Sequence, residues 1–127
     1  MVGLFNILPA QAAEAPSKSA MLFMSPKSFA KMQVMGKWNS KSEYKCLVEL
    51  WDHESHWNPK ALNRYSGAFG IAQFLPTTWK NYNFPYKPKE ANVQITAGLR
   101  YIYKRYDTPC KAWTFWKKQQ KRGNAWY

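Results

Sequence analysis

A chain of 127 residues is long enough for one domain with a single core and too short for two domains of ordinary size. Its 19 Lys and Arg against 7 Asp and Glu give a net charge of +12, which favours a polyanionic partner such as a nucleic acid, an anionic membrane face or an acidic wall polymer. Seven Trp, eight Tyr and seven Phe indicate aromatic rings beyond the core, of the kind that stack on sugars or on bases. No run approaches the roughly 18 apolar residues of a membrane helix, so we expect no membrane span.

Residues 1–24 have the composition of a signal-peptide remnant and a linker, and we exclude them from the expected fold. A short apolar run precedes Ala-Gln-Ala-Ala at residues 10–13, the small-residue pattern of a signal-peptidase site, although no Lys or Arg precedes that run. In an exported protein, Cys46 and Cys110 would form a single disulfide that contributes about 4 kcal/mol. The two cysteines lack the spacing of a zinc site.

The elements predicted from residue 25 onward are helices. Ser25 followed by Pro26 predicts a helix that ends at Gly36. Residues 40–43, Ser-Lys-Ser-Glu, form a capping box that predicts the start of a second helix, which ends at Asn58-Pro59.

The second half of the chain follows the same helical pattern. Residues 63–76 predict a loop with a short helical turn, residues 77–82 a short helix and residues 82–90 a connecting loop. A long helix is predicted over residues 91–106, and Thr108-Pro109 predicts the start of a last helix. Since no stretch shows sustained β alternation, the sequence predicts a mainly α fold with one domain over residues 25–127 and a substrate groove.

Glu54 falls on the apolar face of the second predicted helix. The apolar members of that face are Tyr44, Leu47, Val48 and Trp51. A carboxyl in such a position has a raised pKa when it is buried, because desolvation disfavours its charged form. It can then hold a proton at neutral pH, as a general acid for glycosidic cleavage requires; the alternative is a solvated helix end.

A second catalytic carboxylate is difficult to find. Hydrolysing glycosidases usually place one about 5 to 9.5 Å from the acid. The remaining acidic residues are Glu14, Glu43, Glu49, Asp52, Glu90 and Asp107, and none has the context of a buried nucleophile. The sequence therefore favours a mechanism with one carboxylate, in which the substrate supplies its own nucleophile.

His53 and His56 flank Glu54, but the pattern His-Glu-Ser-His is not the HExxH motif that binds zinc on one helix face. We expect the two histidines at the rim of a groove or exposed, and we expect no metal.

The segment ESHWNPKALNRYSGAFGIAQFLPTTW, residues 54–79, closely resembles the catalytic core of the lytic transglycosylase and goose-type lysozyme family. The family pattern of Glu-Ser, Asn-Pro-x-Ala, Gly-Ala-x-Gly-Leu-x-Gln and Pro-x-Thr-Trp is matched in order. The block NVQITAGLRYI, residues 92–102, resembles the family's later helix. The segments CLVELW, YDTPCKAWTFW and the terminal WY resemble small secreted transglycosylase-like domains of actinobacteria and their phages, and the resemblance covers roughly residues 29–127.

This resemblance implies that Glu54 is the single catalytic acid and base and that Ser55 belongs to the motif that positions it. The residues expected to contact substrate are Ser55, Gln73, Tyr101, Ser66, Gly67 and Ala68.

The implied activity is cleavage of the MurNAc-β-1,4-GlcNAc bond of peptidoglycan, with formation of a 1,6-anhydromuramic end and without a cofactor. A muramidase that uses water, a non-catalytic wall-glycan binder and a basic nucleic-acid binder are the alternatives. The segment KKQQKR fits the last of these, but no nucleic-acid motif accompanies it. We expect a secreted monomer, associated with the cell wall or with a phage particle, whose partner is the peptidoglycan glycan strand.

Overall fold

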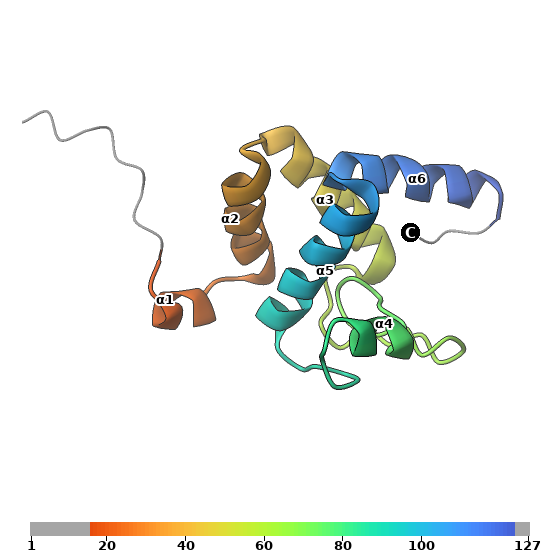
Figure 1. The fold of residues 1–127 in the computed structure, drawn as a ribbon, viewed down its shortest axis with the longest axis horizontal. Helices are drawn as coiled ribbons and strands as arrows, with labels where there is room; N and C mark the ends of the chain where they lie inside the picture. Colours follow the sequence, from red (N-terminus) through yellow and green to blue (C-terminus); the bar gives the residue numbers. More distant parts are fainter. Residues whose placement is uncertain (1–15, 124–127) are drawn as a thin grey trace, which may run out of the picture.

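The computed structural model describes residues 16–123, and most of these are helical (Figure 1). The helices are α1 (Lys18–Leu22), α2 (Pro26–Trp38), α3 (Lys41–Ser55), α4 (Pro76–Asn81), α5 (Ala91–Tyr106) and α6 (Pro109–Lys121). The only pairing of extended backbone within the described range consists of two isolated bridges, Leu62 with Phe69 and Phe69 with Phe74. The predicted mainly α fold is confirmed.

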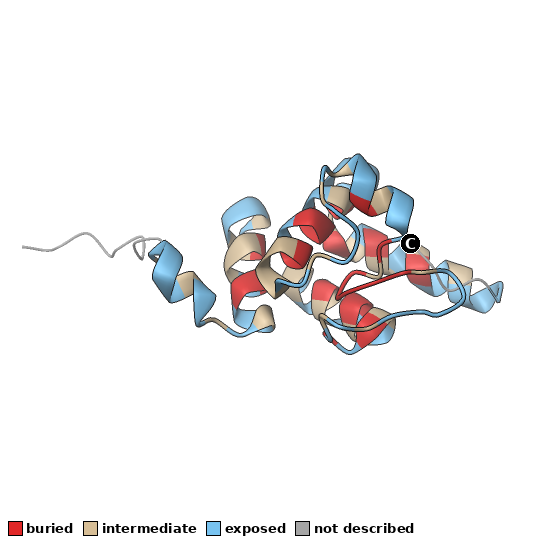
Figure 2. Ribbon diagram, turned by 90° about the horizontal axis from the view of Figure 1, so that it is seen from below, coloured by how far each residue is buried: buried red, intermediate tan, exposed pale blue. Residues whose placement is uncertain are grey.

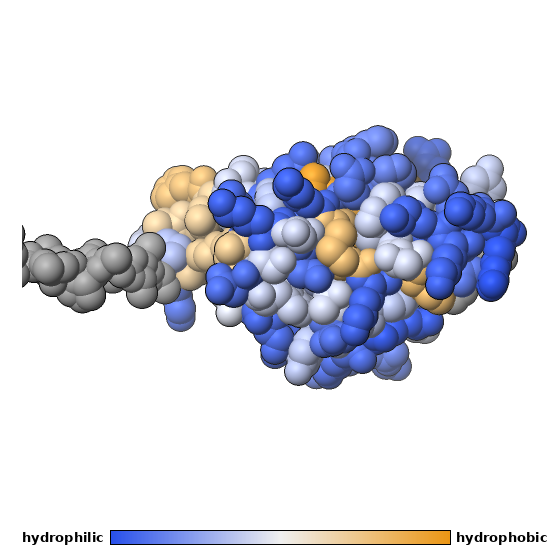
Figure 3. All heavy atoms as spheres, turned by 90° about the horizontal axis from the view of Figure 1, so that it is seen from above, coloured by the Kyte–Doolittle hydropathy of each residue, from blue (hydrophilic) through white to orange (hydrophobic). Residues whose placement is uncertain are grey.

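The segment left out of the expected fold is only partly described. The predicted signal-peptidase pattern at residues 10–13 lies outside the described residues. Residues 18–22, by contrast, form α1, and the Met21 carbonyl accepts a hydrogen bond from the Asn92 side chain of α5 at 3.2 Å. Leu22 and Phe23 are exposed, and Figure 3 shows an apolar area at the α1 end of an otherwise mostly hydrophilic face. The domain boundary at residue 24 stays a prediction.

Three helices begin at the predicted capping residues. The hydroxyl of Ser25 accepts from the Ser28 N–H, that of Ser40 from the Glu43 N–H and that of Thr108 from the Lys111 N–H. Each bond satisfies one of the backbone donors that a helix start leaves unpaired. Each of the three predicted capping residues directly precedes the first residue of its helix.

Two predicted helix ends were wrong. Helix α2 continues through Gly36 to Trp38, because an interior glycine costs a helix only about 1 kcal/mol, and it ends where Asn39 adopts a left-handed conformation with φ of 47°. Helix α3 ends at Ser55, before Asn58-Pro59, because His56 and Trp57 adopt φ values of 52° and 59°.

Glu43 and a disulfide join α3 to the start of α6. The Glu43 carboxylate accepts a hydrogen bond from the Cys110 N–H at 2.7 Å, where its negative charge faces the positive end of the α6 dipole. Cys46 and Cys110 form a disulfide with their Cα atoms 4.9 Å apart. The first turn of α6 is therefore fixed on α3 both covalently and electrostatically.

The core lies between α2, α3, α5 and α6 and extends under the loop that precedes α4 (Figure 2). Trp51 at the centre of α3 is fully buried. Gly98 of α5 lies directly against it, since a Cβ atom at this position would be 2.6 Å from Trp51 Cζ2 and 3.1 Å from the Ala72 Cβ. This contact brings α3, α5 and the loop together one helical turn before Glu54 and one turn before Tyr101.

Candidate active site

Glu54 lies on the last turn of α3, three residues after the buried Trp51. Its Oε1 atom is buried and has no hydrogen-bond partner. Burial raises the pKa of Glu54 from 4.5 to about 7, and the nearby indole of Trp116 lowers it by a smaller amount. A carboxyl with this pKa is substantially protonated at neutral pH, as a general acid must be.

Trp116 of α6 is the aromatic neighbour of the Glu54 carboxyl. Its Nε1 atom is also buried without a hydrogen-bond partner, so the indole acts on the carboxyl by proximity and not through a hydrogen bond of good geometry. Trp116 stacks on Trp113 with ring centroids 5.2 Å apart, and the His53 ring lies 5.1 Å from Trp116. The sequence signal for Trp116 was only its place on the last predicted helix.

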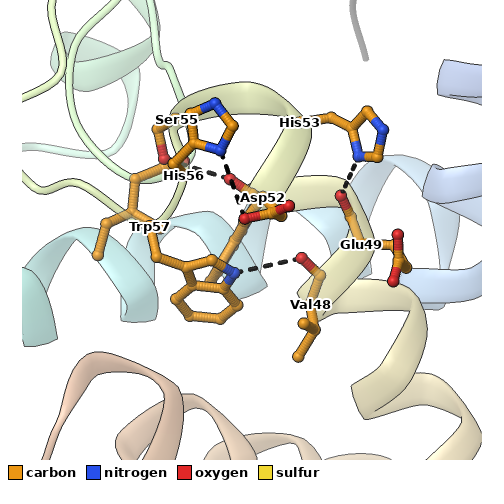
Figure 4. Close-up of polar contacts among 9 residues, drawn as sticks. Val48, Glu49, Asp52, His53, Ser55, His56 and Trp57 are labelled. Atoms are coloured by element: carbon orange, nitrogen blue, oxygen red, sulfur yellow. Dashed lines mark hydrogen bonds and ion pairs between the residues drawn. The ribbon is translucent and has the colours of Figure 1, made fainter.

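Ser55 connects the end of α3 to the loop that precedes α4. Its hydroxyl donates to the Ile71 carbonyl at 2.7 Å and approaches the Trp51 carbonyl at 3.3 Å (Figure 4). The side chain is buried. In this structure Ser55 therefore fixes the backbone next to Glu54, which agrees with a positioning role, while a direct contact of Ser55 with substrate stays a prediction.

The two histidines point away from a common ligand position. His53 Nδ1 lies 2.8 Å from the Glu49 carbonyl, and His56 Nδ1 lies 3.5 Å from Asp52 Oδ1 (Figure 4). Within residues 16–123 no group of three or more His, Cys, Asp or Glu side chains is arranged to hold a metal ion.

Gln73 and Tyr101 meet at a cavity of about 720 Å³. The lining consists of residues 73–75, Thr78, Asn81 and Tyr82, and, from α5, Tyr101, Lys104 and Arg105. Gln73 has a left-handed backbone with φ of 55°, and its amide donates to the carbonyls of Ala61 and Gly70. Glu54 is not part of this lining.

Ser66, Gly67 and Ala68 form a tight turn outside the lining of that cavity. The Ser66 hydroxyl accepts from the Ala68 N–H at 3.1 Å, and the Gly67 carbonyl accepts from the Tyr86 hydroxyl at 2.7 Å. Gly67 has φ of 77°, a conformation that favours glycine. These contacts give Ser66, Gly67 and Ala68 a structural role in shaping the loop. A contact of the three residues with substrate stays a prediction.

Gln94 is a buried residue that sequence reasoning missed. Its side-chain oxygen accepts from the Ile71 N–H at 2.9 Å, and its amide donates to the carbonyls of Pro59 and Pro88. A Cβ atom at Gly70 would lie 2.6 Å from the Gln94 oxygen, so a glycine is required there. Gln94 thereby holds three loop segments around the site, and its only sequence signal was a polar residue beside the apolar face of α5.

The other described carboxylates are occupied or exposed. Asp52 faces His56, Asp107 pairs with Lys111 at 3.2 Å and Glu43 binds the start of α6. Glu43 is also about 16 Å from Glu54 along α3, at a rise of about 1.5 Å per residue. Glu49 and Glu90 are exposed. Within residues 16–123, Glu54 is the carboxyl whose environment resembles that of a catalytic acid.

A helical domain that has a largely buried, protonatable acid at a helix end and a separate polar and aromatic cavity is typical of the lysozyme-like class of glycan-cleaving domains. The chain belongs to the transglycosylase SLT domain family, whose family model matches residues 32–118. At the level of the family this implies lytic transglycosylase activity on peptidoglycan, in an extracellular or cell-wall setting. Neither a curated protein nor a solved structure matches the chain significantly. No helix in the described part of the chain is long and apolar enough to cross a membrane.

Proposed function

We propose that this protein is a peptidoglycan lytic transglycosylase in which Glu54 acts as the single acid and base. The observation that supports this most directly is the buried Glu54 carboxyl, whose pKa burial raises to about 7. No second carboxylate of the described residues has a comparable environment. A single carboxyl can serve both steps if the substrate supplies the nucleophile.

In the first step, protonated Glu54 donates its proton to the oxygen that links MurNAc to GlcNAc. The bond between the MurNAc anomeric carbon and this oxygen breaks, and GlcNAc leaves with the proton. The ionised Glu54 then removes the proton of the MurNAc 6-hydroxyl, whose oxygen bonds to the anomeric carbon and closes the 1,6-anhydro ring. Glu54 ends the cycle protonated, so neither water nor a cofactor is consumed.

Gln73 and Tyr101 are proposed to bind the sugars beside this acid, because both line the cavity. Their polar groups and the aromatic rings of the lining suit the hydroxyls and apolar faces of a sugar. Ser55 and Gln94 are proposed to act indirectly, since both bond to Ile71, two residues before Gln73 in the loop that precedes α4.

Product analysis of digested peptidoglycan tests the proposal. Mass spectrometry should find anhydromuramic ends with the wild-type protein and none with Glu54→Gln. Glu49→Gln, which removes an exposed carboxylate from the same helix, should cleave at the wild-type rate. Reducing ends would identify a muramidase that uses water, and wild-type activity in Glu54→Gln would refute the catalytic assignment.

We further propose that the protein is exported. The disulfide between Cys46 and Cys110 supports this, because such bonds persist in oxidising compartments. Protein recovered from the producing cells should carry the bond and have a mass two units below that of the dithiol. A cytosolic, reduced form would contradict the proposal.

A further inference from the structure

The cavity next to Gln73 and Tyr101 carries positive charge that sugar binding alone does not explain. Lys104 and Arg105 contribute to its lining, and no lining residue is acidic. Its volume of about 720 Å³ falls within the usual range of ligand sites. A neutral glycan would have no use for two cations there, which suggests that the ligand also carries an anionic group.

Lys104 is available to such an anion. Its side chain is exposed and forms no ion pair within the described residues. The Lys104 ammonium lies 5.6 Å from the centroid of the Tyr82 ring, a cation–π distance that orients the side chain along the cavity wall. The acidic residue nearest to it along the chain, Asp107, is paired with Lys111.

The spacing on α5 places the cations next to the proposed sugar contact. Lys104 and Arg105 follow Tyr101 by three and four residues, so the three side chains share one face of the helix. The Arg105 guanidinium lies 5.8 Å from the centroid of the Tyr101 ring. A ligand bound at Tyr101 therefore meets positive charge about one helical turn, or about 5 Å, farther along α5.

We propose that this cavity binds the carboxylates of the stem peptide that MurNAc carries, with Lys104 as the principal anion contact. The assignment rests on the proposed function, which makes peptidoglycan the substrate. MurNAc offers two sources of carboxylate: the stem peptide, and the lactyl group once the peptide has been removed. The cavity is large compared with one carboxylate and has two cations, which favours the longer, multiply charged peptide.

Equilibrium binding to three soluble ligands tests the proposal. The ligands are a muramyl glycan fragment with its stem peptide, the same fragment without the peptide, and a GlcNAc oligomer without any carboxylate. Lys104→Gln should weaken binding of the peptide-bearing fragment by about five- to tenfold and leave the GlcNAc oligomer within about twofold. The loss should shrink as salt is added, because exposed charges are screened.

Lys121→Gln is the matched control, since it removes an exposed lysine from α6, away from the cavity. It should leave binding of all three ligands unchanged. Circular dichroism should show that both variants are folded as the wild type.

Two outcomes would overturn the assignment. Unchanged binding of the peptide-bearing fragment by Lys104→Gln would exclude the anion site, and an equal loss with the peptide-free fragment would identify the lactyl carboxylate as the ligand. Because binding is measured without cleavage, these outcomes are independent of the Glu54→Gln result. Failure of the cavity assignment can thus be distinguished from failure of the proposed catalytic function.

Discussion

The region around Glu54 and the cavity lined by Tyr101 differ in whether their polar groups are buried or exposed to solvent. Near Glu54, the His53 ring of α3 lies against the stacked indoles of Trp113 and Trp116 on α6, and Glu54 Oε1 and Trp116 Nε1 are buried without hydrogen-bond partners. The cavity instead is open, has two cations in its lining and contains no acid. The difference shows how one small domain can separate a dry position for proton transfer from a wet, charged position for binding.

Replacement of Glu54 should have the largest effect on the cleavage rate. It should change only the region formed by Glu54 and Trp116, which we call the dry region. Glu54→Gln should lower the cleavage rate by roughly a thousandfold, since a general acid contributes about 10² to 10⁴. Binding of uncleaved glycan fragments should change little, because the cavity lining does not include Glu54. Cleavage rates and binding constants measured on the same preparation check both statements.

The same substitution should stabilise the folded protein at neutral pH. Between pH 4.5 and 7 the unfolded chain releases the Glu54 proton while the folded chain retains it. Wild-type stability should therefore fall across this window by on the order of 3 kcal/mol, and Glu54→Gln should avoid that loss. Denaturant unfolding of both proteins should agree below pH 4.5 and diverge up to about pH 7; equal stability at pH 8 would contradict the burial of this carboxyl.

Loss of the disulfide should have a comparably large effect on stability. Cys46→Ser with Cys110→Ser should lower the free energy of unfolding by about 4 kcal/mol, because the bond closes a long loop in the unfolded chain. This loss in the free energy of unfolding can be measured by urea unfolding of the double variant, and of the wild type with and without reductant. If the two regions are separable, cleavage should decline more than glycan binding under conditions where the variant is still folded.

Gln94→Leu should lower the free energy of unfolding by about 3 kcal/mol, because it removes the bonds that hold the loops before α4 and α5. The substitution leaves the Ile71 N–H and the carbonyls of Pro59 and Pro88 without their present partner, and buried polar groups are costly to leave unpaired. Thr96→Val, at an exposed position on the same helix, should change stability by less than about 0.5 kcal/mol. An equally small change in the free energy of unfolding of Gln94→Leu would show that water or other groups replace the hydrogen bonds of the Gln94 side chain.

The parts of this structure that the sequence predicted are those set by local interactions. Ser25, Ser40 and Thr108 cap their helices through bonds to backbone groups three residues away, and the predicted helix over residues 91–106 has the observed bounds. The placement of Glu54 on an apolar face also anticipated its partial burial, because helix periodicity alone fixes that face.

The parts that were missed depend on contacts between distant segments. Glu43 was expected to complete its own capping box, yet its carboxylate binds Cys110 of α6. Gln94 and Trp116 gain their roles only when the fold brings loop carbonyls or the Glu54 carboxyl beside them. No period or motif within one segment encodes such partners, so residue type at these positions gave no specific prediction.

Trp116→Phe should produce the smallest effect and gives the sharpest test of how the dry region is built. Burial raises the Glu54 pKa, and the Trp116 N–H lowers it because it favours the ionised carboxyl. We expect the indole ring, as a neighbour of the carboxyl, to contribute to that burial as well. Phenylalanine keeps most of the ring and removes the N–H. We therefore expect the alkaline limb of the profile of kcat/KM against pH, near pH 7 in the wild type, to move upward by up to about one unit.

Trp113→Phe is the matched control, because Trp113 stacks on Trp116 but, unlike Trp116, has no side-chain N–H that lowers the Glu54 pKa. Its alkaline limb should stay at the wild-type position, and KM should be unchanged in both variants. A downward shift in Trp116→Phe would mean that exclusion of water by the larger indole outweighs its N–H. The direction of the shift thus decides whether Trp116 acts on the Glu54 pKa mainly through its N–H or mainly by excluding water.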